Sequence, residues 1–204
     1  MHLRINDVTV SPARIDELGD VLSNKAEPVL RTQTGFQGLL CAADRATGNC
    51  AIVSFWDSKS SLDASEAAIA SIRSETVDAL DAELNSLDIA EVLREVRASP
   101  STVGSRTRVV RIVSPAENAD KLLAFYEEVL PRLQSQEGFL SSRLIRNVDD
   151  QTRFAAVSHW ADQSAVDASD ATSAALRDAV ANAVPVTTIE RVTTSEIILI
   201  ELNT

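Results

Sequence analysis

Imidazoles and thiols, which suit acid–base or metal chemistry near neutral pH, are few in this chain. His2 and His159 are the only imidazoles, and Cys41 and Cys50 are the only thiols. Neither half of the chain has a CxxC pair, a histidine-rich cluster or another spacing suited to a metal ion. His159 precedes Trp160, so their side chains point to opposite faces of a strand, and a structural or surface role would explain His159 without chemistry.

The two cysteines fall on the two strands of a predicted hairpin and could be neighbours across it. A disulfide there would be unusual in a reducing compartment. Buried thiols that pack as small apolar side chains are the simpler interpretation. We therefore expect Cys41 and Cys50 to be structural.

That hairpin is present twice, and its two copies organise the chain. Residues 35–56 read GFQGLLCAADRATGNCAIVSFW, and residues 138–160 read GFLSSRLIRNVDDQTRFAAVSHW. Each copy opens with Gly-Phe, passes through a polar turn and closes with a tryptophan, Trp56 or Trp160. Two apolar, β-rich runs around a polar turn predict a pair of antiparallel strands.

The segments around the first hairpin predict a ferredoxin-like unit. Apolar residues alternate over 3–10 as in a strand and recur at helical spacing over 13–32, where Pro28 predicts a kink or an early end. A second helix follows the hairpin, and a fourth strand covers 89–96. Strand, helix, two strands, helix, strand is the split βαβ order of ferredoxin-like domains.

A second unit repeats the first. Its landmarks recur 103 residues later, as Ser114-Pro115 does after Ser11-Pro12, and 104 residues later beyond the hairpin turn. The repeat predicts one unit over 1–97 and another over 107–204. Between them, residues 98–106 contain Ser, Pro and Gly without periodicity, as a linker does.

Each unit alone would leave one face of its four-stranded sheet uncovered. Two copies in one chain can pack sheet against sheet, which buries both faces without a second molecule. We therefore predict an α+β fold in which two tandem ferredoxin-like units pack sheet to sheet. The expected assembly is a monomer with this intrachain pseudo-dimer, or a homodimer of it.

The charge of the chain excludes whole classes of partner. The net charge is −11, and both halves are acidic. Nucleic acid or an anionic membrane would be repelled. No apolar run approaches the ~20 residues needed to cross a bilayer, and residues 1–4 lead into a strand pattern rather than a signal peptide. We expect a cytoplasmic protein.

Three linked patterns follow one another in the second repeat, and the first repeat has them less fully. They are GF-x-x-x-x-L-x-R, a strand that closes with HW or FW, and a helix that opens as W-x-x-x-S-x-x-D-A. The second copy has them most fully, through Gly138-Phe139, Leu144, Arg146, His159-Trp160 and a helix over 162–184. Together they resemble the antibiotic biosynthesis monooxygenase family of dimeric α+β barrels. The family includes cofactor-free oxygenases, haem-degrading enzymes and members without a known reaction, so the resemblance implies that this chain is one of these kinds.

For the haem-degrading branch the resemblance is incomplete. Asn6 matches the first-strand asparagine of that branch, but Ser65 stands in place of its tryptophan and Glu75 in place of its histidine ligand. The corresponding residues of the second unit are Val109, Ser169 and Ala179. Haem iron needs a basic nitrogen or a thiolate at a fixed point of the pocket. We therefore expect no cofactor and rank haem third.

The cofactor-free branch implies a different kind of site. Its substrate, once deprotonated, gives an electron to dioxygen, so the protein supplies a dry pocket, shape and anion stabilisation. The resemblance suggests His159, Arg143 and Asn6 as catalytic residues. The candidates for substrate binding are Trp160, Trp56 and Arg146. The implied partners are a small aromatic, polyketide- or quinol-type molecule and dioxygen.

Each candidate also has an explanation without chemistry. A tryptophan that closes a strand is commonly a core anchor. Arg143 and Arg146 have opposite parity, so a regular strand admits only one of them to a pocket. If one unit works, we expect the second, which keeps His159. The alternative function is a non-catalytic ligand-binding protein, or a scaffold with no pocket large enough for a bicyclic ligand.

Overall fold

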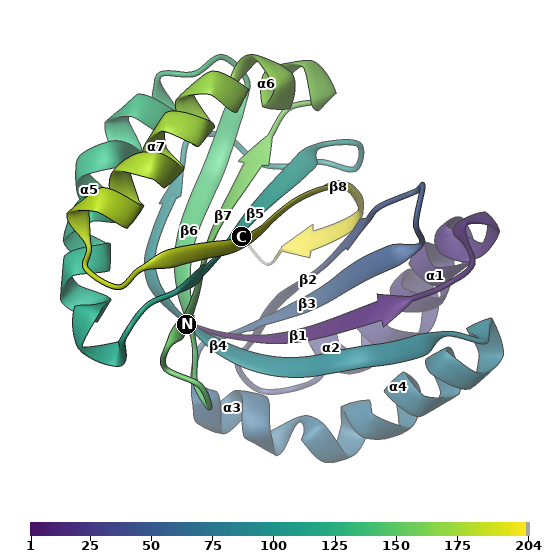
Figure 1. The fold of residues 1–204 in the computed structure, drawn as a ribbon. Coiled ribbons are helices and arrows are strands. Elements are labelled where there is room, and N and C mark those ends of the chain that lie inside the picture. The colour runs from purple at the N-terminus through teal and green to yellow at the C-terminus, as the bar shows by residue number, and fades with distance from the viewer. Residues whose placement is uncertain (203–204) are drawn as a thin grey trace. The chain divides into compact units, whose positions relative to one another are not determined.

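The computed structural model describes residues 1–202, which form two compact units (Figure 1). Unit 1 comprises residues 1–90 together with the chain from Ser195, and unit 2 comprises residues 91–194. Each unit contains the predicted order of strand, helix, two strands, helix and strand. The predicted α+β class with tandem ferredoxin-like units is therefore confirmed.

Most of unit 1 comes from the first half of the chain. Its strands are β1 (His2–Thr9), β2 (Phe36–Ala43), β3 (Asn49–Trp56) and the beginning of β4 (Glu83–Arg97). Its helices are α1 (Ile15–Val21), α2 (Glu27–Arg31), α3 (Lys59–Ala64) and α4 (Glu66–Leu80). A π-helical turn, Leu22–Ala26, separates α1 from α2.

Unit 2 repeats this plan with a longer, continuous first helix. Its strands are β5 (Arg106–Val113), β6 (Phe139–Asn147), β7 (Arg153–Trp160) and the beginning of β8 (Thr188–Leu202). Its helices are α5 (Ala119–Gln134), α6 (Gln163–Ala168) and α7 (Asp170–Ala183). Helices α5 and α7 lie side by side over one face of the strands (Figure 1).

The two sheets have the same internal order. The first strand pairs antiparallel with the third, and the third with the second, as β1-β3-β2 and as β5-β7-β6. β4 follows β1 in the strand order, and β8 follows β5, which completes the ferredoxin-like order in each unit. Strand β8 is long enough that its last residues, 196–202, also pair with β2.

The first helix differs between the units because unit 1 has one residue more. Arg4 pairs with Ser54 as Arg108 pairs with Ser158, a separation of 104 residues, whereas Phe36 and Phe139 are 103 apart. The additional residue is accommodated in the π-helical turn, where the N–H of residue 27 donates to the carbonyl of residue 22. Helix α5 is continuous over the same stretch.

This insertion corrects two details of the predicted repeat. The separation is 104 residues from the first strand to the start of the helix, so Ser11-Pro12 is not the structural counterpart of Ser114-Pro115. For the same reason the counterpart of Asn6 is Val110 rather than Val109. Proline is not what interrupts the helix, because Pro131 lies inside the continuous α5.

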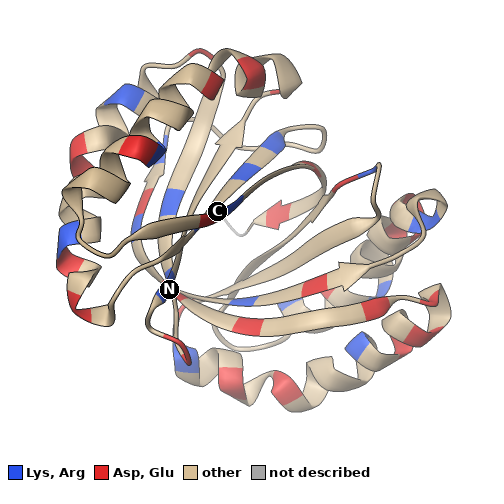
Figure 2. Cartoon of the chain, viewed as in Figure 1, with Lys and Arg blue, Asp and Glu red and all other residues tan. Residues whose placement is uncertain are grey.

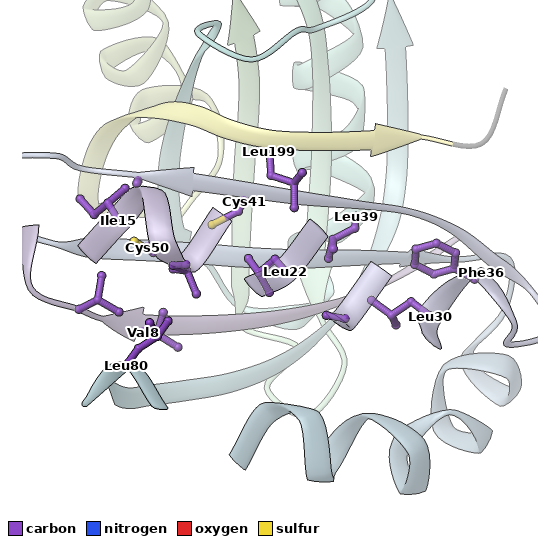
Figure 3. Close-up of a cluster of buried hydrophobic side chains, with 14 of the residues drawn as sticks. Val8, Ile15, Leu22, Leu30, Phe36, Leu39, Cys41, Cys50, Leu80 and Leu199 are labelled. Atoms are coloured by element: carbon purple, nitrogen blue, oxygen red, sulfur yellow. The ribbon is translucent and has the colours of Figure 1, made fainter. Parts of the chain in front are cut away.

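The core of unit 1 lies between the sheet and the helices. Figure 3 shows Leu22 and Leu30 on the helical side and Leu39 and Phe36 on the strand, within one buried cluster. The apolar residues that recur at helical spacing face the apolar side of the sheet, and removing both surfaces from water buries them.

Cys41 and Cys50 belong to the same core and are free thiols. Cys41 lies opposite Ile52 in the register, and Cys50 lies opposite Ala43, so the cysteines are diagonal neighbours. The hydrogen bond with Cys50, together with burial, raises the pKa of the Cys41 thiol. The expected structural role of both cysteines is confirmed.

The charged residues of the described chain lie mainly on its helices and loops. Acidic side chains are spread over the helices of both units (Figure 2), which accords with the net charge of −11. Among the described residues, the helices are all too short or too polar to cross a membrane.

Candidate functional site

An arginine from the first strand of unit 1 is buried among groups of the following helices. Arg4 is 1% exposed and donates from Nη1 to Ser65 Oγ at 3.0 Å and from Nη2 to the Leu62 carbonyl at 2.7 Å. Its Nη2 also lies 3.0 Å from Glu66 Oε2. Burial lowers the pKa of Arg4, and the carboxylate of Glu66 opposes that effect.

Arg108 is the counterpart in unit 2 and has more partners. Its Nη1 donates to Ser169 Oγ at 2.8 Å and also to Ser173. Its Nη2 donates to the Val166 carbonyl at 2.9 Å and pairs with Asp170. Burial lowers the pKa of Arg108 as it does in unit 1.

The tryptophans that close the hairpins hold these arginines. Trp56 and Trp160 are fully buried, and each ring centroid lies 5.8 Å from the guanidinium carbon of its arginine. Each indole N–H donates at 2.9 Å to a serine two residues earlier. Both were predicted to line a substrate pocket, but the structure places them against Arg4 and Arg108, outside the linings of the two pockets described next.

Unit 1 contains a pocket of about 60 Å³ between the sheet and the helices. Its walls are mainly aliphatic side chains from β1, β2, α4 and the interrupted first helix. The polar residues that line it are Arg4, Asn6, Ser54, Arg73 and Thr76. An apolar pocket with a few polar groups is the common form of a small-molecule site.

Three polar atoms that line this pocket or stand behind it are buried without a hydrogen-bond partner. They are Asn6 Oδ1, Arg4 Nε and Arg73 Nε. Both terminal nitrogens of Arg73 donate to Glu66, Nη1 to Oε1 at 3.0 Å and Nη2 to Oε2 at 3.1 Å. These hydrogen bonds from Arg73 lower the pKa of Glu66. Because Arg4 pairs with the same carboxylate, two guanidinium groups share one negative charge. The wall of the pocket therefore carries a net positive charge.

Unit 2 has a pocket of about 90 Å³ in the equivalent place. Arg108 and Arg177 line it, as Arg4 and Arg73 line the pocket of unit 1. The other polar side chains in the lining are Tyr126, Ser142, Ser158 and Ser173.

The polar groups of the unit 2 pocket are engaged with one another. The Tyr126 hydroxyl donates to Ser142 Oγ at 2.7 Å, and Ser142 donates to the carbonyl of Val157 at 3.2 Å. Burial raises the pKa of Tyr126 to about 12, so the phenol stays protonated. Ser173 accepts from Arg108. Among the described residues, no polar side-chain atom in the lining of this pocket is both buried and without a partner.

The residues that favoured unit 2 at the sequence level lie elsewhere. Ser158 lines the pocket, so His159, its neighbour on β7, points to the opposite face of the sheet. His159 is 3% exposed, lies 2.9 Å from Ser101 Oγ through Nδ1, and has its pKa lowered to about 3 by burial, with Arg143 adding to the effect. It is therefore neutral at physiological pH.

Arg143 and Arg146 are both held by glutamates of β4. Arg143 Nε lies 2.7 Å from Glu95 Oε1, and Arg146 donates from Nη2 to Glu91 Oε1 at 2.6 Å. Neither arginine is in the lining of the unit 2 pocket. Of the six predicted site residues, Asn6 alone lines one of the two pockets.

Sequence reasoning missed the arginines on the first strands. Arg4 and Arg108 occupy the same structural position, but the inserted residue in unit 1 hid this from a repeat aligned at 103. A signal was present in Arg73 and Arg177, which recur at 104 residues on the second helix. An arginine kept in both copies on an apolar helix face is the pattern to look for.

Neither pocket has the groups that haem needs. The unit 1 lining contains no histidine, cysteine, methionine or tyrosine, and the unit 2 lining offers Tyr126, whose high pKa disfavours the phenolate that would bind iron. Ser65 and Ser169 are hydrogen-bonded to the buried arginines. Among residues 1–202, three or more metal-binding side chains do not cluster anywhere.

Comparisons with known proteins agree with this fold. The sequence profile of the antibiotic biosynthesis monooxygenase family matches residues 1–70 and 106–182, one segment in each repeat. Two curated relatives, the uncharacterized proteins MT2634 and Rv2557 of Mycobacterium tuberculosis, are 27% identical over 121 residues, 58% of this chain. The aligned part spans about half, 53%, of the length of these relatives.

Solved structures are similar over nearly the whole chain. A proposed monooxygenase from Fusobacterium nucleatum superposes with a TM-score of 0.72 at 14% identity, covering 98% of this chain and 94% of that one. An anthrone oxidase-like protein gives 0.66 at 14% identity, with coverage of 98% and 93%. The haem-degrading enzyme of Listeria monocytogenes gives 0.55 at 12% identity, with 96% and 99%. At these identities the similarity establishes the fold alone.

Proposed function

Because the chain belongs to the antibiotic biosynthesis monooxygenase family, we propose that it is a cofactor-independent monooxygenase of a small, electron-rich aromatic molecule. Polyketide- and quinol-type compounds are the proposed substrate class. The observation that carries the proposal is the apolar pocket of unit 1, whose wall holds two guanidinium groups against one carboxylate.

The reaction needs no metal or flavin if the substrate supplies the electrons. Once deprotonated, an anthrone-type methylene passes electrons to dioxygen; one oxygen atom becomes the new carbonyl oxygen, and the other leaves as water with the two methylene hydrogens. The protein then has to exclude water and stabilise the substrate anion. Apolar walls and the charges of Arg4 and Arg73 would do both.

The pocket lining also limits which substrates are suitable. Within the described chain, no carboxylate and no imidazole lines the unit 1 pocket, so a strong general base is missing from its wall. We therefore propose substrates that ionise readily, such as phenols and enols. Asn6 supplies the hydrogen-bonding group beside the arginines.

Oxygen uptake by the purified protein tests this function. Chelator-treated protein is mixed with anthrone or a quinol in an oxygen electrode, and Arg73→Met is compared with Arg177→Met, its counterpart in unit 2. We expect consumption of one dioxygen per substrate, a rate at least tenfold lower in Arg73→Met, and a rate unchanged in Arg177→Met. No uptake with any such substrate, or loss of uptake on chelation, would refute the proposal.

A non-catalytic ligand-binding protein or scaffold is the second candidate, and the small size of the pockets favours the scaffold. They measure about 60 and 90 Å³, whereas an engineered apolar cavity that binds benzene has about 150 Å³. A bicyclic ligand must therefore widen either pocket as it enters. Binding of aromatic ligands without oxygen consumption would identify the ligand-binding function.

A further inference from the structure

The unit 1 pocket presents an incomplete set of hydrogen bonds. Asn6 is 8% exposed, and its Oδ1 is unpartnered, as are Nε of Arg4 and Nε of Arg73. All three side chains line the same pocket. Leaving a buried polar atom unpaired destabilises a fold, so three such atoms on side chains of one pocket call for an explanation.

Glu66 determines which atoms remain available. It accepts from both terminal nitrogens of Arg73 and pairs with a terminal nitrogen of Arg4. Ser65 and the Leu62 carbonyl take the other bonds of Arg4. In each guanidinium, Nε is therefore the buried nitrogen that has no partner.

The acceptor lies on the same strand face as one donor. Arg4 and Asn6 are two residues apart on β1, which places their backbone positions about 7 Å from each other with side chains on one face. Two N–H donors of positive groups and one amide acceptor therefore belong to side chains that line the pocket. A ligand that completes this set carries an oxyanion and a hydroxyl group.

The counterpart residues in unit 2 do not form this set. Val110 replaces Asn6, and Ser173 replaces Ile69 and accepts a hydrogen bond from Arg108. No atom of the unit 2 pocket is among the unpartnered buried atoms of the described residues. The difference is what a ligand site in one copy and a structural site in the other would produce.

We propose that the unit 1 pocket binds a hydroxyaromatic anion. Its oxyanion accepts hydrogen bonds from Nε of Arg4 and of Arg73, and its hydroxyl group donates to Oδ1 of Asn6. Identification of this ligand as the substrate rests on the function proposed above, whereas the binding itself does not.

The π-helical turn gives the pocket a means of widening. Leu22 and Ala26, the first and last residues of that turn, both line the pocket. A π-helical turn interrupts the regular hydrogen bonding of an α-helix, and such turns occur often at functional sites. Because both residues come from the helical side, outward movement of this turn would enlarge the pocket without displacing the sheet.

Calorimetric titration with three probes tests the proposal on the full-length protein. 3-Hydroxybenzoate has both groups, benzoate lacks the hydroxyl, and 3-hydroxybenzyl alcohol lacks the charge. We expect 3-hydroxybenzoate to bind at least tenfold more tightly than either of the others. Asn6→Val, which installs the residue type of unit 2, should abolish the advantage over benzoate and leave benzoate binding unchanged.

The arginines supply the matched control. Arg73→Met should weaken both benzoate and 3-hydroxybenzoate by at least tenfold, and Arg177→Met should weaken neither. Absence of 3-hydroxybenzoate binding to the wild-type protein would overturn the proposal, as would equal losses in the two arginine variants. Binding with this pattern but without oxygen uptake on any substrate would retain the site and reject the oxygenase function.

Discussion

The two pockets of this chain share a frame but differ in what they leave unpaired. In both units an arginine of the first strand rests against the tryptophan that closes the hairpin, and a second arginine projects from the following helix. In unit 1 these groups retain unpartnered buried atoms, whereas in unit 2 Tyr126, Ser142 and Ser173 are hydrogen-bonded and no described lining atom is both buried and unpartnered. The two units therefore share the contact between arginine and tryptophan but differ in the side chains that line the pocket.

The largest expected effect concerns the inserted residue. Deleting Asn24, an exposed residue of the π-helical turn, should give unit 1 a continuous helix like α5 and change the free energy of unfolding by less than about 1 kcal/mol. Deleting Glu128, an exposed residue of α5, turns the rest of that helix by about 100°. Leu130 and Leu133 then leave the core at a cost above about 3 kcal/mol.

Urea unfolding followed by circular dichroism measures both deletions. Similar losses in the two variants would show that the π-helical turn is not a tolerated insertion. The shared frame would then be less regular than the register of the strands indicates.

The buried arginines should differ in their contribution to stability. Arg108→Met takes the arginine donor from two serine hydroxyls and one of several donors from the Val166 carbonyl, and it should cost about 3 kcal/mol. Arg4→Met removes fewer bonds and should cost about 2 kcal/mol. Both partner carboxylates are partly solvent-exposed, so they add little. A larger cost for Arg4→Met in chemical denaturation would reverse the assignment of the better satisfied pocket.

The buried imidazole predicts a pH dependence that belongs to unit 2. His159 has a pKa of about 3 in the fold instead of 6.5, so the unfolded chain binds its proton first as the pH falls. The contribution of His159 to the free energy of unfolding is fully present above about pH 6.5 and is lost progressively as the pH falls toward about 3. Between about pH 7.5 and about pH 5, the wild type should lose about 2 kcal/mol relative to His159→Gln. Parallel stability curves for the two proteins would contradict the neutral, buried state.

The smallest effect is expected at the tyrosine of unit 2. Tyr126→Phe removes the hydrogen bond to Ser142 and should cost about 1 kcal/mol in thermal or urea unfolding. The proposed ligand site lies in unit 1, where Leu22 occupies the place of Tyr126. The affinity of the protein for 3-hydroxybenzoate should therefore stay the same. A change in that affinity would bring the unit 2 pocket into the binding site.

Much of the fold could be predicted from the sequence because it depends on local and periodic signals. The Gly-Phe openings, polar turns and closing tryptophans placed both hairpins, which the structure confirms as β2–β3 and β6–β7. The π-helical turn could not be predicted, since a one-residue insertion in an amphipathic helix leaves the apolar residues near their expected spacing.

The site was less predictable because it depends on which face of a strand a residue takes and on partners distant in sequence. His159 and Arg143 have the chemistry of a catalytic pair, but β7 and β6 direct them away from the unit 2 pocket. Arg4 had no local signal, since its partners Leu62, Ser65 and Glu66 come from helices about 60 residues later. Asn6 was found through family resemblance.

The most direct test of the difference between the units observes the arginine Nε–H groups themselves. In ¹H–¹⁵N NMR spectra of the wild-type protein titrated with 3-hydroxybenzoate, the Nε–H resonances of Arg4 and Arg73 should shift and become protected from exchange, with those of Arg108 and Arg177 unchanged. That result would establish an anion site confined to unit 1. Shifts at Arg108 and Arg177 alone, or at none of the four, would contradict it.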